Sequence, residues 1–332
     1  MLAKSLAWWV PVLLLGVCGH TTHAAQTDPI ARLVVEKRLG EASRAIEARL
    51  ARNAADPAAL SALVDLRIAQ GSEEGLSQAR AAAERCVEAH PDSSPCAEAL
   101  GNALMAESNA SGVLAFVRNA RAIRDTLERA LRFDPVNYRA RVNLMRFYLE
   151  TPFFLGGSEL RARELATEAR RTDPDLTRLM RAMVAFDEGK LDEAEEHILT
   201  ADLDEYVLVQ GSQRELLLTL ATFHLDARRY AQSSLLFQEL GRRLPSSEHG
   251  PYGLALVARA QGRLGEAVVQ LEKAAAIAPR PYVYKTLGEV HEARADRRRA
   301  IAAYQAALAG VPPLARREYA QVAAHLTQLQ RR

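Results

Sequence analysis

The sequence predicts an all-α protein in which helical hairpins stack into an elongated solenoid. The clearest hairpin lies between Pro281 and Pro312, where small and apolar residues recur at intervals of three and four. These intervals place the side chains on one face of a helix. Related spacings recur back to residue 26, and prolines follow the expected helix ends at Pro57, Pro91, Pro135 and Pro174. A chain built from one repeated unit predicts a single solenoid instead of two globular domains.

The hairpin between Pro281 and Pro312 shows how each unit is built. Gly288 and Ala300 supply the small side chains that two helices need where their backbones approach, and Tyr304 fills a wider gap. Eight positions carry the pattern: Tyr284, Leu287, Gly288, His291, Ala300, Tyr304, Ala307 and Pro312. They resemble the signature of the tetratricopeptide repeat (TPR). The resemblance implies an α-solenoid of about eight TPR-like hairpins with a C-terminal capping helix.

The resemblance covers nearly all of residues 25–332, as one TPR superhelix. The expected units are 26–57, 58–92, 94–136, 137–174, 175–205, 214–246, 248–280 and 281–313. Residues 314–330 form a further amphipathic helix, the expected cap. The fifth unit has no proline stop between Asp202 and Gly211, so a linker and a distorted helix end are both open there.

Residues 1–24 predict a secretory signal peptide. Lys4 precedes an apolar run from Leu6 to Val17, which is too short to span a bilayer as a stable helix. A lipoprotein signal acylated at Cys18 is the alternative, although Val17 stands where such signals carry a small residue. Both alternatives predict export, and we expect a soluble periplasmic protein.

Two cysteines, Cys86 and Cys96, remain after the predicted signal. An even pair in an exported chain is a candidate disulfide. Cys86 lies near the end of one expected helix and Cys96 near the start of the next, so the turn at Pro91 can bring them within bonding distance. Two buried thiols are the alternative.

Two neighbouring units carry insertions. We expect a turn lengthened by about ten residues over Glu107–Ala122, and about five extra residues over Thr151–Gly157. Turns of successive units lie along one edge of a solenoid, so the insertions should meet. Their apolar residues form either a local satellite core or a rim that receives a partner: Phe116, Val117, Phe153 and Phe154. The second insertion resembles that of exported bacterial TPR proteins with a Pro-x-x-x-Gly-Gly pattern, which implies a cell-envelope setting.

The sequence carries no motif of catalytic chemistry. Gly-rich phosphate loops, Cys-x-x-Cys pairs, His-Glu-x-x-His patterns and Gly-x-Ser-x-Gly elbows are all missing. His197 follows an acidic run, but such runs on a repeat helix are usually solvent-exposed, so no metal site is predicted. We therefore expect no enzyme activity, no cofactor and no metal.

The charge and the shape of the chain suggest its partners. The net charge is only +2 and no basic stripe exists, which disfavours nucleic acid. No stable membrane insertion is expected, and the oligomeric state stays open. Stacked hairpins create a concave face that suits an extended peptide or a partner helix. The expected partner-binding residues on this face are Glu98, Asn102, Arg139, Asn143, Arg146, Tyr282 and Lys285.

Two functional hypotheses follow. The leading one is an exported, non-enzymatic scaffold that binds protein or peptide in the cell envelope, with Arg139 and Arg146 as candidate receivers of an acidic group. The alternative is a soluble accessory component of an envelope transporter that binds a small ligand between units.

Overall fold

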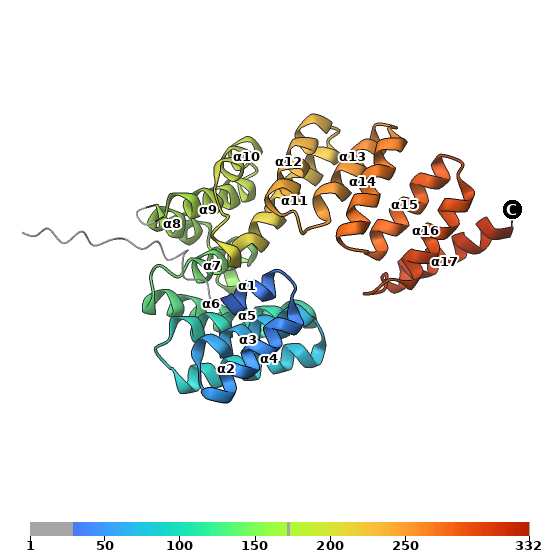
Figure 1. Ribbon diagram of the computed structural model, residues 1–332. Helices are drawn as coiled ribbons and strands as arrows, with labels where there is room; N and C mark the ends of the chain where they lie inside the picture. Colours follow the sequence, from blue (N-terminus) through green and yellow to red (C-terminus); the bar gives the residue numbers. More distant parts are fainter. Residues whose placement is uncertain (1–28, 171–172, 332) are drawn as a thin grey trace, which may run out of the picture.

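The computed structural model describes residues 29–170 and 173–331, and every regular element in these ranges is a helix. Consecutive helices pack as hairpins, and the hairpins stack side by side along the chain (Figure 1). This arrangement confirms the predicted α-solenoid. The predicted signal peptide and Cys18 lie outside the described residues.

The N-terminal arm contains three hairpins. Its helices are α1 (Pro29–Val35), α2 (Leu39–Arg52), α3 (Pro57–Gln70), α4 (Glu73–Ala89), α5 (Ser94–Ser111) and α6 (Val113–Phe133). Pro57 is the first residue of α3, where a missing N–H has no consequence, and the Asp56 carboxylate accepts from the Ala59 N–H at 2.8 Å. The Asp-Pro pair therefore starts this helix as well as following the previous one.

A bend joins this arm to the rest of the chain (Figure 1). It contains α7 (Tyr138–Glu150), the 3₁₀ helix η2 (Phe153–Leu155), α8 (Glu159–Ala169), α9 (Pro174–Asp187), α10 (Leu191–Thr200) and the 3₁₀ helix η3 (Val207–Val209). Beyond the bend, the later helices run toward the right of Figure 1, above and then beside the N-terminal arm.

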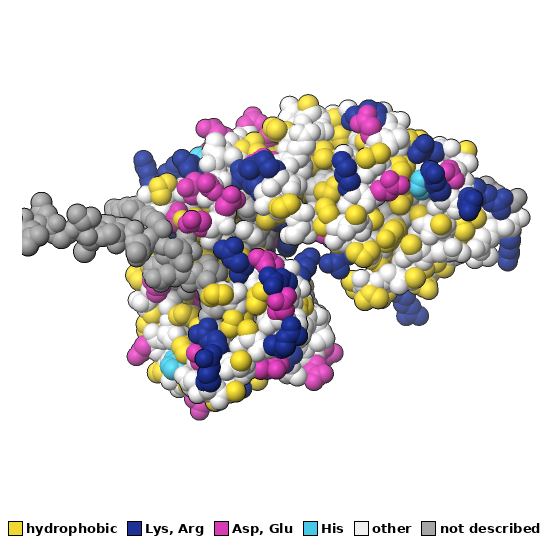
Figure 2. Space-filling model, in the orientation of Figure 1, with side chains coloured by type: hydrophobic (Ala, Val, Ile, Leu, Met, Phe, Trp, Pro, Cys, Tyr) yellow, Lys and Arg dark blue, Asp and Glu magenta, His cyan; other side chains and the backbone are white. Residues whose placement is uncertain are grey.

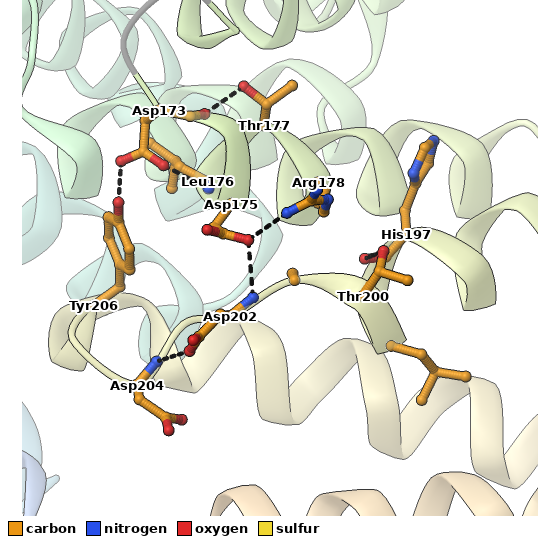
Figure 3. Close-up of polar contacts among 12 residues, drawn as sticks. Asp173, Asp175, Leu176, Thr177, Arg178, His197, Thr200, Asp202, Asp204 and Tyr206 are labelled. Carbon is orange, nitrogen blue, oxygen red and sulfur yellow. Dashed lines mark hydrogen bonds and ion pairs between the residues drawn. The ribbon is translucent and has the colours of Figure 1, made fainter.

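The segment between α10 and η3 is held against the start of α9 (Figure 3). The Asp202 N–H donates to Asp175 Oδ1 at 3.0 Å, and the Tyr206 hydroxyl donates to the Asp173 carboxylate. The Tyr206 ring also meets the Tyr138 ring of α7 edge to face, with centroids 5.4 Å apart. The end of the fifth unit, where the repeat pattern is weak, is thus a linker between α10 and η3 that hydrogen bonds hold against α9.

The C-terminal arm repeats the hairpin more regularly. Its helices are α11 (Gln210–Asp226), α12 (Tyr230–Arg243), α13 (His249–Ala260), α14 (Leu264–Ile277), α15 (Pro281–Ala293), α16 (Arg297–Ala309) and α17 (Arg316–Arg331). A Cβ atom added at Gly288 would lie 2.6 Å from Tyr304 Cε1, so the small residue is needed at this approach. Val322, Leu326 and Leu329 of α17 are buried in a cluster with Tyr304, which confirms the predicted cap.

The structure corrects the expected long turn over Glu107–Ala122. Both helices continue through the insertion, and Gly112, with a left-handed φ of 85°, joins α5 to α6 alone. Apolar residues keep the helical period along α6 and are buried: Ala115, Ala120, Ile123, Leu127 and Ala130. Asn119 Nδ2 donates to Ser108 Oγ at 3.0 Å across the hairpin. The insertion therefore lengthens the helices instead of the turn.

Cys86 and Cys96 form a disulfide in the structure, with Cα atoms 5.2 Å apart. Both are fully buried beside Leu60, and the bridge ties the last turn of α4 to the first turn of α5.

Replacing both cysteines with alanine is expected to lower the free energy of unfolding by about 2 to 3 kcal/mol, because the bridge closes a loop with a sequence separation of 10. Urea denaturation of the C86A/C96A chain measures this loss, with the parent chain in reductant as the control. Intact-mass analysis after thiol alkylation reports the bridge directly. Two free thiols in protein recovered from an oxidising compartment would exclude it.

Candidate functional site

Four of the predicted concave-face residues meet in one polar network on α5 and α7. Arg139 Nη1 donates to Asp65 Oδ2 at 2.7 Å, and Arg139 Nε lies 3.0 Å from Glu98 Oε1. Asn102 Nδ2 donates to Glu98 Oε1 at 3.0 Å, and Asn143 Nδ2 donates to Asn102 Oδ1 at 2.7 Å. Glu98 and Asn102 are each only 8% exposed. Contrary to expectation, these two side chains are therefore not accessible to a partner at the surface.

The charges in this network depend on one another. Burial raises the pKa of Glu98, and the Asp65 charge adds to this effect while Arg139 opposes it. Burial alone would lower the pKa of Arg139, but the Asp65 and Glu98 carboxylates raise it above its ordinary value. The acidic group that Arg139 holds is therefore supplied by this chain, as Asp65.

Arg146 and Lys285 are engaged elsewhere in the chain. Arg146 Nε donates to Glu150 Oε1 at 3.1 Å, and Arg146 Nη2 lies 3.2 Å from Glu215 Oε2, which ties α7 to α11. It borders a pocket of about 160 Å³ whose apolar lining is Leu149, Met183, Phe186 and Leu216. Lys285 Nζ pairs with Glu318 of the capping helix.

A groove lies between the N-terminal and C-terminal arms. Two adjoining pockets of about 610 and 450 Å³ share Lys37, Arg214 and Arg280 in their linings. Figure 2 shows Lys and Arg side chains gathered where the surface is hollowed between the arms. We call this feature the central groove. Its apolar lining includes Val34, Val35, Val207, Leu208, Pro281 and Leu314.

The central groove carries unpaired positive charge. Within the described residues, the side chains of Lys37 and Arg214 have no hydrogen bond or ion pair. Arg280 Nε lies 3.3 Å from Glu248 Oε1. The other acidic residues of the lining are each paired with a cation of the chain: Glu36, Asp65 and Glu318. Two cations thus remain for an incoming anionic group.

Three polar residues that line the smaller pocket, Glu248, His249 and Tyr282, contact one another. The Tyr282 hydroxyl donates to Glu248 Oε1 at 2.9 Å, and the buried Glu248 Oε2 has no hydrogen-bond partner, with His249 Nδ1 at 3.7 Å. Burial acts to raise the pKa of Glu248, but its own backbone amide, the charges of His249 and Lys37 and the Tyr282 hydroxyl lower it overall. Burial lowers the pKa of His249, Glu248 opposes this effect, and the charges of Arg214 and Lys37 add to it. Glu248 therefore keeps a negative charge beside the unpaired cations.

Sequence reasoning found only part of the central groove. Tyr282 and Arg139 border it, whereas Lys37, Arg214, Arg280, Glu248 and His249 were missed. Arg214, Glu248 and Arg280 stand at or near the starts of α11, α13 and α15, so the register that selected Tyr282 could have selected them. Lys37 had no such signal, because α1 reaches η3 only through the tertiary fold.

The predicted rim residues separate into two kinds. Phe116 is half-buried, with its ring centroid 6.3 Å from that of Phe147. Val117, Phe153 and Phe154 are exposed, and the last two rings meet edge to face at 5.7 Å. The satellite-core alternative is therefore wrong for Phe153 and Phe154.

The described residues hold no group of three or more side chains suited to a metal ion, and His197 lies 3.7 Å from one carboxylate, that of Glu193. In the same part of the chain, no helix is both long and apolar enough to cross a bilayer.

Solved structures share this fold at low sequence identity. Yeast Tom70 aligns with a TM-score of 0.59 and 16% identity over 89% of this chain, which spans 59% of the Tom70 chain. The Cut9–Hcn1 hetero-tetramer of APC/C gives a TM-score of 0.48 and 16% identity, covering 90% of this chain and 54% of that one. The human IFIT1 dimer with m7Gppp-AAAA gives a TM-score of 0.45 and 16% identity, covering 91% and 72%. No protein family model and no curated protein matches the sequence. The chain is thus an α-solenoid with a TPR-like fold.

Proposed function

We propose that this protein is an exported, non-enzymatic scaffold of the cell envelope that binds an acidic segment of another protein in the central groove. The observation that carries this proposal is the pair of unpaired cations, Lys37 and Arg214, in a groove with apolar walls. Grooves of stacked helical hairpins suit extended segments and helices of partner proteins.

The position of the cations suggests how such a segment binds. Lys37 belongs to the N-terminal arm, and Arg214 and Arg280 belong to the C-terminal arm. Carboxylates that enter between them gain charge-assisted hydrogen bonds, while the apolar walls accept neighbouring side chains. One bound segment therefore contacts both arms and holds them together.

Charge reversal in the groove tests this function. The K37E/R214E chain is compared with the parent and with R294E/R298E, which reverses two exposed arginines at the turn between α15 and α16 that line neither pocket of the groove. Crosslinking and affinity capture from the native envelope should recover one defined protein with the parent and the control. Loss of two charge-assisted contacts should weaken its binding about 100-fold in the K37E/R214E chain.

The outcomes separate the alternatives. If the K37E/R214E chain captures as much of the protein as the parent does, the central groove is not the binding site. If the parent captures no protein reproducibly, the protein is not a scaffold. A small ligand retained by the parent without any protein would favour the transporter-accessory alternative. The intact mass of the exported chain distinguishes cleavage before Ala25 from acylation at Cys18.

A further inference from the structure

The two insertions create an edge of exposed apolar side chains. At the start of α6, Val113 is 79% exposed, Leu114 is 82% exposed and Val117 is 44% exposed. In η2, Phe153 is 86% exposed and Phe154 is 71% exposed. The η2 segment contacts α6, and Gly156 at its end approaches Arg124 of that helix. We call the exposed apolar residues of α6 and η2 together the apolar edge. Exposed apolar surface of this kind marks an interaction site.

The apolar edge projects from the stack of hairpins. Helices α5 and α6 have 18 and 21 residues, whereas α7 and α8 of the next hairpin have 13 and 11. The tip at Gly112 therefore extends past its neighbour. Side chains that stand more than 70% exposed on a tip and a short loop can enter a fluid environment, such as the acyl region of a bilayer, without a preformed pocket.

The charges of the apolar edge favour an anionic partner. Residues 108–124 contain Arg118, Arg121 and Arg124 and no acidic residue, and residues 151–158 contain no charged residue. Within the described residues, Arg118 has no ion pair or hydrogen bond from its side chain. The Arg121 side chain is 87% exposed, and its Nε lies 3.4 Å from Asp125 Oδ2. The flanking acidic groups are each paired with an arginine: Glu107, Asp125, Glu150 and Glu159.

We propose that the apolar edge inserts into the surface of an anionic phospholipid bilayer and anchors the protein peripherally. Phe153, Phe154 and Leu114 enter the boundary of the acyl chains, while Arg118 and Arg121 remain at the lipid phosphates. Two copies of an edge with arginines and no acidic residue would repel each other, so the charge favours lipid over a second copy. This anchoring is independent of the central groove.

Vesicle flotation tests the anchor with the full chain. The parent should float with phosphatidylglycerol and phosphatidylethanolamine vesicles, less with phosphatidylcholine vesicles, and less as ionic strength rises. The F153S/F154S chain should lose about tenfold in partitioning for each phenylalanine removed. The matched control F223S/L235S changes two exposed apolar residues of the C-terminal arm and should bind like the parent. Residues 1–24 are common to all chains, so their contribution cancels.

A site-specific signal tests the depth of insertion. Both natural tryptophans are first removed by W8F and W9F. On vesicle binding, the tryptophan fluorescence of the Phe153→Trp chain should shift to the blue and be quenched by lipids brominated along the acyl chain. The fluorescence of the control chain, Phe223→Trp, should not change in either way. Equal quenching of the two chains, or equal flotation of F153S/F154S and F223S/L235S, would overturn the proposal. A dimer in analytical ultracentrifugation that F153S/F154S disperses, without vesicle binding, would overturn it in favour of a second copy.

Discussion

Replacing Arg139 with alanine is expected to lower the free energy of unfolding by about 3 to 5 kcal/mol. The change leaves the buried carboxylate of Glu98 and the largely buried carboxylate of Asp65 without the cation that lies between them. The hydrogen bonds that Asn102 and Asn137 donate to Glu98 remain, but neutral amides do not compensate two buried charges. Urea denaturation of R139A against the parent at pH 7 measures the loss.

The loss should depend on pH. Burial raises the pKa of Glu98 above 4.5, so the folded chain binds this proton more tightly than the unfolded chain does. The stability that this group contributes is fully present below its unfolded pKa and is lost as the pH rises through its folded pKa. Removing Arg139 raises the pKa of Glu98 further. The destabilisation by R139A should therefore be largest near neutral pH and shrink as the pH falls toward the unfolded pKa of Glu98.

Arg146 provides the matched control, because its partners Glu150 and Glu215 have side chains 62% and 58% exposed. Exposed ion pairs contribute little, so R146A should lower the free energy of unfolding by less than about 1 kcal/mol. Equal losses for R139A and R146A, or a loss for R139A that does not change with pH, would contradict the buried network.

Local patterns in the sequence were sufficient for the fold. Helical stripes, Asp-Pro pairs and the spacing of Gly288 and Tyr304 act within one hairpin, and each hairpin packs mainly on its neighbours. The same register brought Glu98, Asn102, Arg139 and Asn143 together, because equivalent positions of successive first helices stack. Their burial was not visible, because it depends on how tightly those helices curve around Asp65.

Long-range arrangement explains what the sequence did not predict. The central groove exists because α1 reaches η3, which places Lys37 and Arg214 in one lining. No repeat register relates these two residues. The insertion over Glu107–Ala122 was expected as a turn because it exceeds the repeat length. The insertion is helical instead, because its residues favour helix and continue the apolar face of α6. Only Gly112 separates α5 from α6.

Replacing Gly288 with leucine should lower the free energy of unfolding by about 3 kcal/mol, because the approach of α15 to α16 leaves no room for a side chain. Even a Cβ atom would lie 2.6 Å from Tyr304 Cε1 and 2.7 Å from Tyr304 Cδ1. The ring is 3% exposed, and its hydroxyl donates to Glu292 Oε2 at 3.1 Å, so it cannot move aside without losing packing and this hydrogen bond.

The same substitution at Gly265 separates packing from helix propensity. Gly265 also lies in a helix, α14, but nothing stands within 4 Å of an added Cβ atom. Leucine is a better helix former than glycine, so G265L should leave the unfolding midpoint unchanged or raise it slightly. If G265L lowers the free energy of unfolding as much as G288L does, glycine is needed at both positions for its backbone conformation and not for packing. A loss confined to G288L identifies this glycine as the contact at which the two helices of the most regular hairpin meet.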